Sequence, residues 1–73
     1  MFKINISIER NKDGFLAIPT DVGGVHCQAK TRKEAIDLLK KTVETMLLDY
    51  TEEAIYELKS REIFTNTIVI DLD

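Results

Sequence analysis

The sequence has little of what catalytic and metal sites are usually built from. It contains a single cysteine, Cys27, and a single histidine, His26, among 73 residues. One cysteine cannot form an intrachain disulfide and leaves no cysteine cluster for zinc, so a reducing compartment is the simpler assumption. No nearby motif would position His26 as a general base. We therefore expect a protein that is not an enzyme and that needs no cofactor.

Long apolar runs are also missing. The longest, such as residues 15–18, are far shorter than the roughly 20 residues of a membrane-spanning helix, and the alternating N-terminus does not resemble a signal peptide.

The net charge of −3 argues against a nucleic-acid binder that relies on overall charge. We expect one cytoplasmic domain over residues 1–73. Because so short a domain buries only about 60% of its unfolded surface, a homodimer or higher homo-oligomer would stabilise it.

Alternation of apolar and polar residues predicts strands in the first half of the chain. Phe2 to Ile8 has a period of two, and Asp13-Gly14 is a strong hairpin signal. The return strand is apolar on both faces, which favours a central position, and Pro19 should end it. Asp21 to Gly24 predicts a second turn, and Cys27 follows the apolar alternation of a third strand, which indicates burial. The strands expected in the whole chain cover residues 2–9, 15–18, 25–30 and 65–72.

The segment between the third and last strands predicts helix. Thr31-Arg32-Lys33-Glu34 fits a capping box, in which the Thr31 hydroxyl accepts the Glu34 N–H and the Glu34 carboxylate reaches back to the Thr31 N–H. An apolar stripe with spacings of three and four follows: Ala35, Leu38, Leu39, Thr42, Val43, Met46 and Leu47. Helical pattern resumes after Tyr50 with Thr51 as a cap, so residues 31–60 form either one bent helix or two.

These elements predict an α+β fold of the order β-β-β-α-(α)-β. A right-handed helical crossover after a three-stranded meander would place the last strand parallel to the first. We therefore expect a mixed four-stranded sheet with helix packed on one face. The opposite face and the open edge of the third strand are the expected binding surfaces, because exposed apolar residues and unpaired strand edges favour association.

Three pieces of the sequence, in order and with matching spacing, resemble the HicB-like antitoxin domain family. They are Asp13-Gly14-Phe15-Leu16-Ala17, Asp21-Val22-Gly23-Gly24, and Gln28 with Thr31-Arg32-Lys33-Glu34-Ala35. The resemblance covers residues 2–48 and, loosely, the last strand. It departs from the family pattern at three positions. The family has prolines where this chain has Thr20 and Gly23, and a glycine where it has Ala29. The matching turn and cap positions are Asp13, Gly14, Asp21, Gly23, Gly24, Thr31, Glu34 and Ala35.

The resemblance implies a trimmed ribonuclease H-like core without a working active site. It also implies a partner, a small HicA-type toxin that has a double-stranded-RNA-binding-domain fold and cuts mRNA. The chain stops at Asp73, directly after the last expected strand, so the DNA-binding segment of many family members is not expected. The leading hypothesis is an antitoxin-like module that sequesters a HicA-like toxin by occlusion.

Two other functions stay open. A stand-alone member of the fold would bind RNA or another protein without any toxin, although the cluster of Lys30, Arg32 and Lys33 has too few cations for tight RNA binding. A residual nuclease would need converging carboxylates, whereas the candidates lie in turns or at the chain end: Asp13, Asp21, Asp71 and Asp73. The residues expected to contact a partner are His26, Gln28, Lys30, Arg32 and Lys33.

Overall fold

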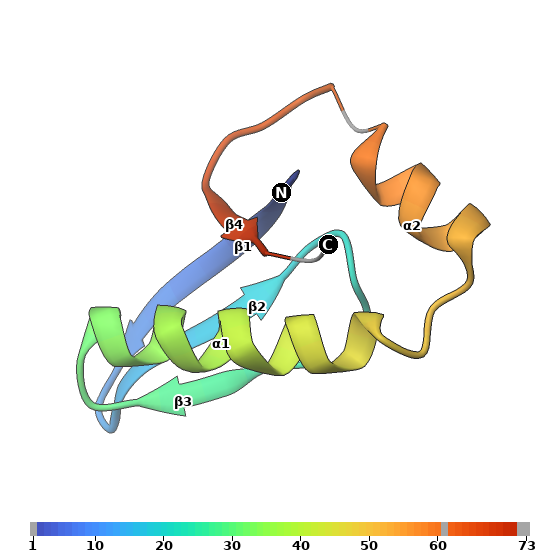
Figure 1. Ribbon diagram of the computed structural model, residues 1–73. Helices are drawn as coiled ribbons and strands as arrows, with labels where there is room; N and C mark the ends of the chain where they lie inside the picture. The colour runs from blue at the N-terminus through green and yellow to red at the C-terminus, as the bar shows by residue number, and fades with distance from the viewer. Residues whose placement is uncertain (1, 61, 72–73) are drawn as a thin grey trace.

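The computed structural model describes residues 2–60 and 62–71 as an α+β fold with one four-stranded sheet and two helices (Figure 1). The strands lie in the order β3-β2-β1-β4, and every neighbouring pair is antiparallel. The elements in chain order are β1 (Phe2–Asn11), β2 (Gly14–Pro19), β3 (Cys27–Ala29), α1 (Arg32–Leu47), α2 (Glu52–Lys59) and β4 (Thr67–Ile70).

The longest strand, β1, pairs with different strands along its two halves. Phe2 to Asn5 pair with β4, and Ile6 to Asn11 pair with β2. The predicted alternation is confirmed, because Ile4 and Ile6 are buried while the side chains between them face the other side. The sheet is therefore staggered, with β1 joining a β4 half to a β2–β3 half.

The central position of β2 and its end at Pro19 are also confirmed. Its partner β3 is shorter than expected, covering Cys27–Ala29 in place of residues 25–30. Pairing stops at Ala17 opposite Cys27, and continuation would place Val25 opposite Pro19, which has no N–H to donate. Residues 20–24 bend the chain before β3 begins.

The predicted direction of the last strand was wrong. Strand β4 runs antiparallel to β1, with Ile4 opposite Ile68, so the sheet is antiparallel throughout and not mixed. The crossover prediction assumed that helix alone connects β3 to β4. Instead residues 62–66, which follow α2, lie beside Asn5 and Ile6 in the middle of β1, and β4 runs from there toward the start of β1 (Figure 1). The strand is also shorter than expected, and Leu72 lies outside the described residues.

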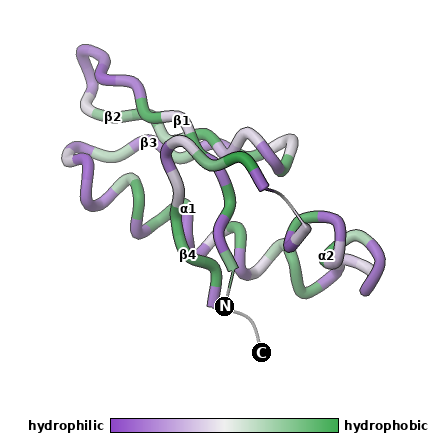
Figure 2. Tube along the Cα trace, turned by 90° about the horizontal axis from the view of Figure 1, so that it is seen from above, coloured by the Kyte–Doolittle hydropathy of each residue, from purple (hydrophilic) through white to green (hydrophobic). Residues whose placement is uncertain are grey.

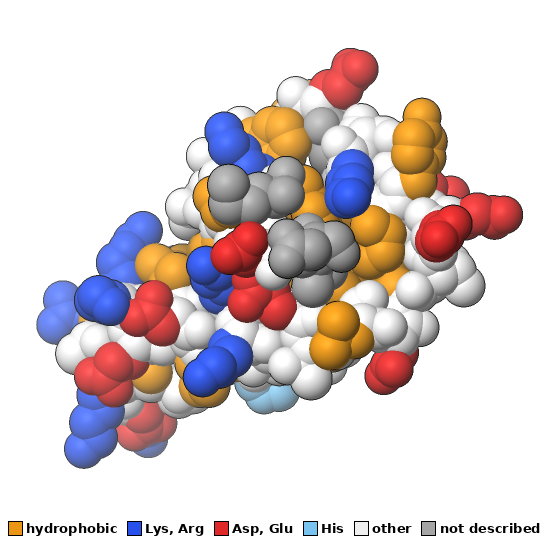
Figure 3. Space-filling model, in the orientation of Figure 1, with side chains coloured by type: hydrophobic (Ala, Val, Ile, Leu, Met, Phe, Trp, Pro, Cys, Tyr) orange, Lys and Arg blue, Asp and Glu red, His pale blue; other side chains and the backbone are white. Residues whose placement is uncertain are grey.

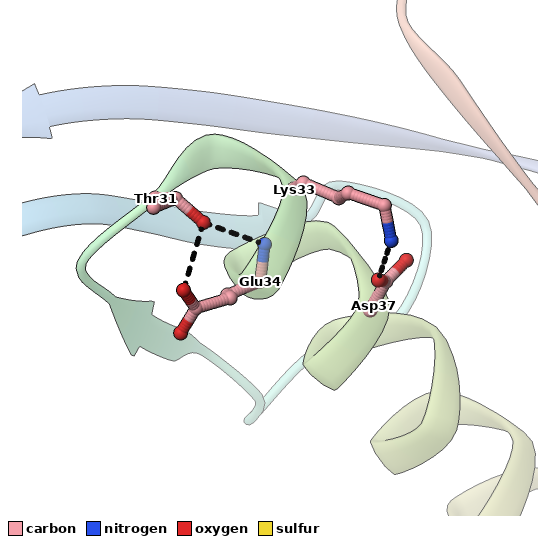
Figure 4. A network of polar contacts seen from close by, with 4 residues as sticks. All are labelled: Thr31, Lys33, Glu34 and Asp37. Atoms are coloured by element: carbon pink, nitrogen blue, oxygen red, sulfur yellow. Dashed lines mark hydrogen bonds and ion pairs between the residues drawn. The ribbon is translucent and has the colours of Figure 1, made fainter.

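Two separate helices follow β3, each begun by a threonine. The Thr31 hydroxyl accepts from the Glu34 N–H at 3.1 Å, and the Thr51 hydroxyl accepts from the Ala54 N–H at 3.1 Å. The Glu34 carboxylate lies 3.2 Å from the Thr31 hydroxyl rather than on the Thr31 N–H, which corrects one half of the predicted capping box (Figure 4). Helix α1 ends at Leu47, and residues 48–51 separate it from α2.

The core lies between one face of the sheet and α1. Four residues of the predicted stripe are buried in it, while Leu38 remains 47% exposed. Helix α2 stands at the end of the molecule and contributes Leu58 to the core (Figure 2). Neither described helix is long and apolar enough to cross a membrane. The buried residues are Ile4, Ile6, Ala17, Val22, Cys27, Ala35, Leu39, Val43, Leu47, Leu58, Ile68 and Ile70.

Candidate protein-binding surface

The face of the sheet opposite α1 carries apolar side chains inside a polar frame. Because side chains alternate along a strand, the residues paired with Ser7 and Glu9 of β1 share this face, and they are Ile18 and Leu16 of β2. On the other side of β1, Val69 of β4 lies opposite Lys3. Both helices contribute to the buried face, and within the described residues neither helix covers this open face.

A loop adds a further apolar contribution next to Lys3. The Lys3 ammonium lies 6.0 Å from the centre of the Phe64 ring, at the outer limit for a cation–π contact. Phe64 is 41% exposed, Val69 is 42% exposed and Ile63 is 82% exposed. We define the open face as Lys3, Leu16, Ile18, Phe64 and Val69, where aromatic and aliphatic groups alternate with polar β1 residues, as is typical of interface surfaces.

Asn5 holds this surface together. Its side-chain amide donates to the Ile63 carbonyl at 2.9 Å and its side-chain oxygen accepts from the Thr65 N–H at 2.9 Å. Its backbone N–H donates to the Asp21 carboxylate at 2.8 Å, and its carbonyl accepts from the Thr20 N–H at 2.9 Å. Asn5 is the last β1 residue paired with β4, so these bonds tie two loops to the point where β1 changes partners.

Replacing Asn5 by alanine should lower the free energy of unfolding by about 1–3 kcal/mol, because two backbone groups of residues 62–66 lose their partners. Urea denaturation followed by circular dichroism measures this change. The matched control is Ser7→Ala, the next outward-facing residue on β1, with an expected change within about 0.5 kcal/mol. Equal losses in the two variants would contradict the role assigned to Asn5.

The residues expected to contact a partner fall into two groups. His26, Gln28 and Lys30 are exposed along β3 and its ends, where Gln28 exchanges hydrogen bonds with Asn11 at 3.0 and 3.3 Å. Arg32 and Lys33 are exposed in the first turn of α1, on a different surface. The predicted set therefore does not form one patch on the open face.

The predicted basic cluster is weakened by an ion pair. The Lys33 ammonium lies 2.7 Å from the Asp37 carboxylate, one helical turn away (Figure 4). This hydrogen bond, with the attraction between the charges, raises the pKa of Lys33. Lys33 therefore has an anionic partner on its own helix, and Lys30 and Arg32 are the other cations of the cluster.

The turn and cap residues of the family resemblance have structural positions. Gly14 has φ +131° and Gly24 has φ +80°, whereas Gly23 adopts no positive φ. Asp21 accepts the Asn5 N–H, and Ala35 is fully buried beneath the Thr31 cap. Asp13 closes the hairpin, its N–H donating to the Asn11 side chain at 3.0 Å.

The chemistry-bearing side chains are dispersed. Within residues 2–60 and 62–71, no three His, Cys, Asp or Glu side chains are placed to share a metal ion, and Asp73 lies outside these ranges. Cys27 is buried, which confirms the prediction, since its side chain is 6% exposed. Its thiol lies 3.7 Å from the Thr42 hydroxyl.

Sequence reasoning missed Asn5 and the Ile63–Phe64 pair. Asn5 fits the polar side of the β1 alternation, and its bonds join residues about 60 positions apart, which periodicity does not reveal. The apolar pair between Glu62 and Thr65 was a usable signal.

Comparison of the chain with models of known protein families, with curated proteins and with solved structures finds no match.

Proposed function

We propose that this chain is a non-catalytic binding module that recognises a protein through the open face of its sheet. The observation that carries the proposal is the one-sided packing of the sheet. Both helices contribute to the core on one face, and the other face presents Leu16, Ile18, Phe64 and Val69. An apolar surface of this kind with a polar rim favours a protein partner.

For the partner, we propose a small toxin of the HicA type. The support is the ordered resemblance to HicB-like antitoxins at the Gly14 hairpin, the Asp21 turn and the Thr31 cap, each of which has a structural role. The antiparallel direction of β4 departs from the mixed sheet expected at first. That departure lies outside residues 2–48, where the resemblance is close.

The proposed mechanism is occlusion. The toxin's nucleic-acid-binding surface must carry positive charge to engage phosphates. This chain has a net charge of −3, and Glu9 lies at the border of the open face opposite Leu16. A partly apolar surface bordered by Glu9 would cover such a site and compete with mRNA for it.

The test is an mRNA-cleavage assay with the HicA-like product of the reading frame that adjoins this gene. Adding the chain in equimolar amount should stop cleavage, since occlusion needs one binding surface per toxin. Unchanged cleavage with a large excess of the chain would contradict the toxin assignment, as would a genome in which no such frame adjoins the gene. Saturable, salt-dependent binding of the chain to short RNA would instead favour the RNA-binding alternative.

A further inference from the structure

The outer edge of β3 points its central backbone groups away from the sheet. Within residues 2–60 and 62–71, β3 pairs only with β2, and the sheet ends there. The Ala29 carbonyl oxygen lies against Gly14 of β2, so it faces inward. Because backbone groups alternate in direction along a strand, the N–H and C=O of Gln28 face away from β2. The middle residue of β3 is thus free to exchange two hydrogen bonds with another strand.

A shallow groove runs beside this edge between β3 and α1. Gln28, Ala29 and Lys30 form one wall, and Glu34, Leu38 and Lys41 lie on the other. Leu38 is the apolar residue of α1 that the core leaves 47% exposed. Figure 3, which shows the α1 side of the molecule, has acidic and basic side chains interspersed toward the start of this helix.

The charges on the helical wall of the groove are complementary to those of a second copy of the helix that runs antiparallel to the first. Glu34, Leu38 and Lys41 follow one another at helical spacing, with opposite charges on the two sides of the leucine. A two-fold axis through Leu38 would place Leu38 against its own copy. It would also place Glu34 of each copy near Lys41 of the other.

The same axis suits the strand. Gln28 lies across the groove from Leu38, so an axis near both residues would pair Gln28 with Gln28 of a second copy, antiparallel. Helix α1 packs against both β2 and β3, and strands are spaced by about 4.8 Å. Joining two β3 edges would therefore bring the two α1 helices to about 10 Å apart, the distance of ordinary helix packing.

We infer that the β3 edge and the Glu34–Leu38–Lys41 stripe bind a second copy of this chain, forming a two-fold dimer with one continuous eight-stranded antiparallel sheet. The dimer leaves the open face of each copy uncovered, so it does not depend on the toxin proposal. The interface consists of the edge of a three-residue strand and one helical stripe, so we expect a weak dimer with a dissociation constant on the order of 10–100 µM.

Sedimentation equilibrium of the full chain tests the dimer. The wild type should approach twice the monomer mass at several hundred micromolar, and Leu38→Glu should weaken association at least about tenfold. The matched control is Leu48→Glu, which adds the same charge at a leucine that is 73% exposed just after α1 and should associate like the wild type. A monomeric wild type at 1 mM, or equal behaviour of the two variants, would overturn the inference.

A charge exchange tests the two-fold geometry itself. Lys41→Glu and Glu34→Lys should each weaken self-association severalfold, because two like-charged contacts replace two attractive ones. An equimolar mixture should form a heterodimer about tenfold tighter than either homodimer, since both contacts are again opposite in charge. Circular dichroism first confirms that Glu34→Lys keeps its helix, as Glu34 also contacts Thr31. A mixture that associates no better than its components would overturn the proposed axis.

Discussion

Replacing Gly14 by alanine is expected to lower the free energy of unfolding by about 3 kcal/mol or more. Gly14 has φ +131°, a conformation that residues with a Cβ rarely adopt. A Cβ there would overlap the Ala29 carbonyl oxygen and lie 2.9 Å from the Lys30 Cα, both of which are backbone atoms that no rotamer change can move. Strain at the residue and displacement of β3 therefore add together.

The other two glycines provide matched controls for this substitution. Gly24 has φ +80° but open space around it, so Gly24→Ala should cost about 1 kcal/mol from backbone strain alone. Gly23 has neither a positive φ nor a neighbour within 4 Å of an added Cβ, so Gly23→Ala should be neutral or stabilising by up to about 1 kcal/mol. Urea denaturation at fixed protein concentration ranks the three. A Gly14 variant as stable as the Gly23 variant would contradict the close packing of β3 against Gly14.

Leu39→Ala is expected to cost about 2–5 kcal/mol. Leu39 is fully buried in the middle of α1, and removing its side chain would open a cavity between the helix and the sheet. A domain of 73 residues has a total stability of about 4–11 kcal/mol, so the loss would remove a large fraction of that stability.

The control for the Leu39 substitution is Leu48→Ala. Leu48 is 73% exposed at the end of the same helix, and its loss should change the free energy of unfolding by less than about 0.5 kcal/mol. Thermal and urea unfolding of both variants measure the difference. Comparable losses would mean that α1 does not use the Leu39 side to cover the sheet.

The local signals in the sequence predicted local structure well. The alternation in β1, the Asp13-Gly14 hairpin and the Thr31 cap each depend on interactions between residues a few positions apart. The sequence does not decide between one helix and two over residues 31–60, because the apolar pattern continues on both sides of Tyr50 and no local signal shows whether the helix bends or stops.

Features that depend on distant residues were not predictable in the same way. The direction of β4 depends on where residues 62–66 cross β1, and that crossing is fixed by Asn5 through bonds to the Ile63 and Thr65 backbone. The local sequence of β4 is apolar in alternation and fits either direction. The open face was expected in outline, but Phe64 joins it only because that loop is held beside Lys3.

The two proposed interfaces occupy different parts of the molecule. The dimer uses the β3 edge and α1, and the protein partner uses the opposite face of the sheet from Leu16 to Val69. A two-fold dimer would therefore present two open faces and bind two partner molecules. Partner binding and self-association can accordingly be disrupted separately, by Val69→Glu and by Leu38→Glu.

The central claim, that the open face binds a protein partner, is tested most directly by calorimetric titration with the HicA-like product of the adjoining reading frame. The titration compares the wild type, Val69→Glu and Leu48→Glu. Val69→Glu should stay folded, because the new carboxylate lies opposite Lys3. We predict that Val69→Glu weakens binding at least about tenfold, while Leu48→Glu binds like the wild type. Undiminished binding by Val69→Glu, or an equal loss in Leu48→Glu, would contradict the assignment of the open face as the binding surface.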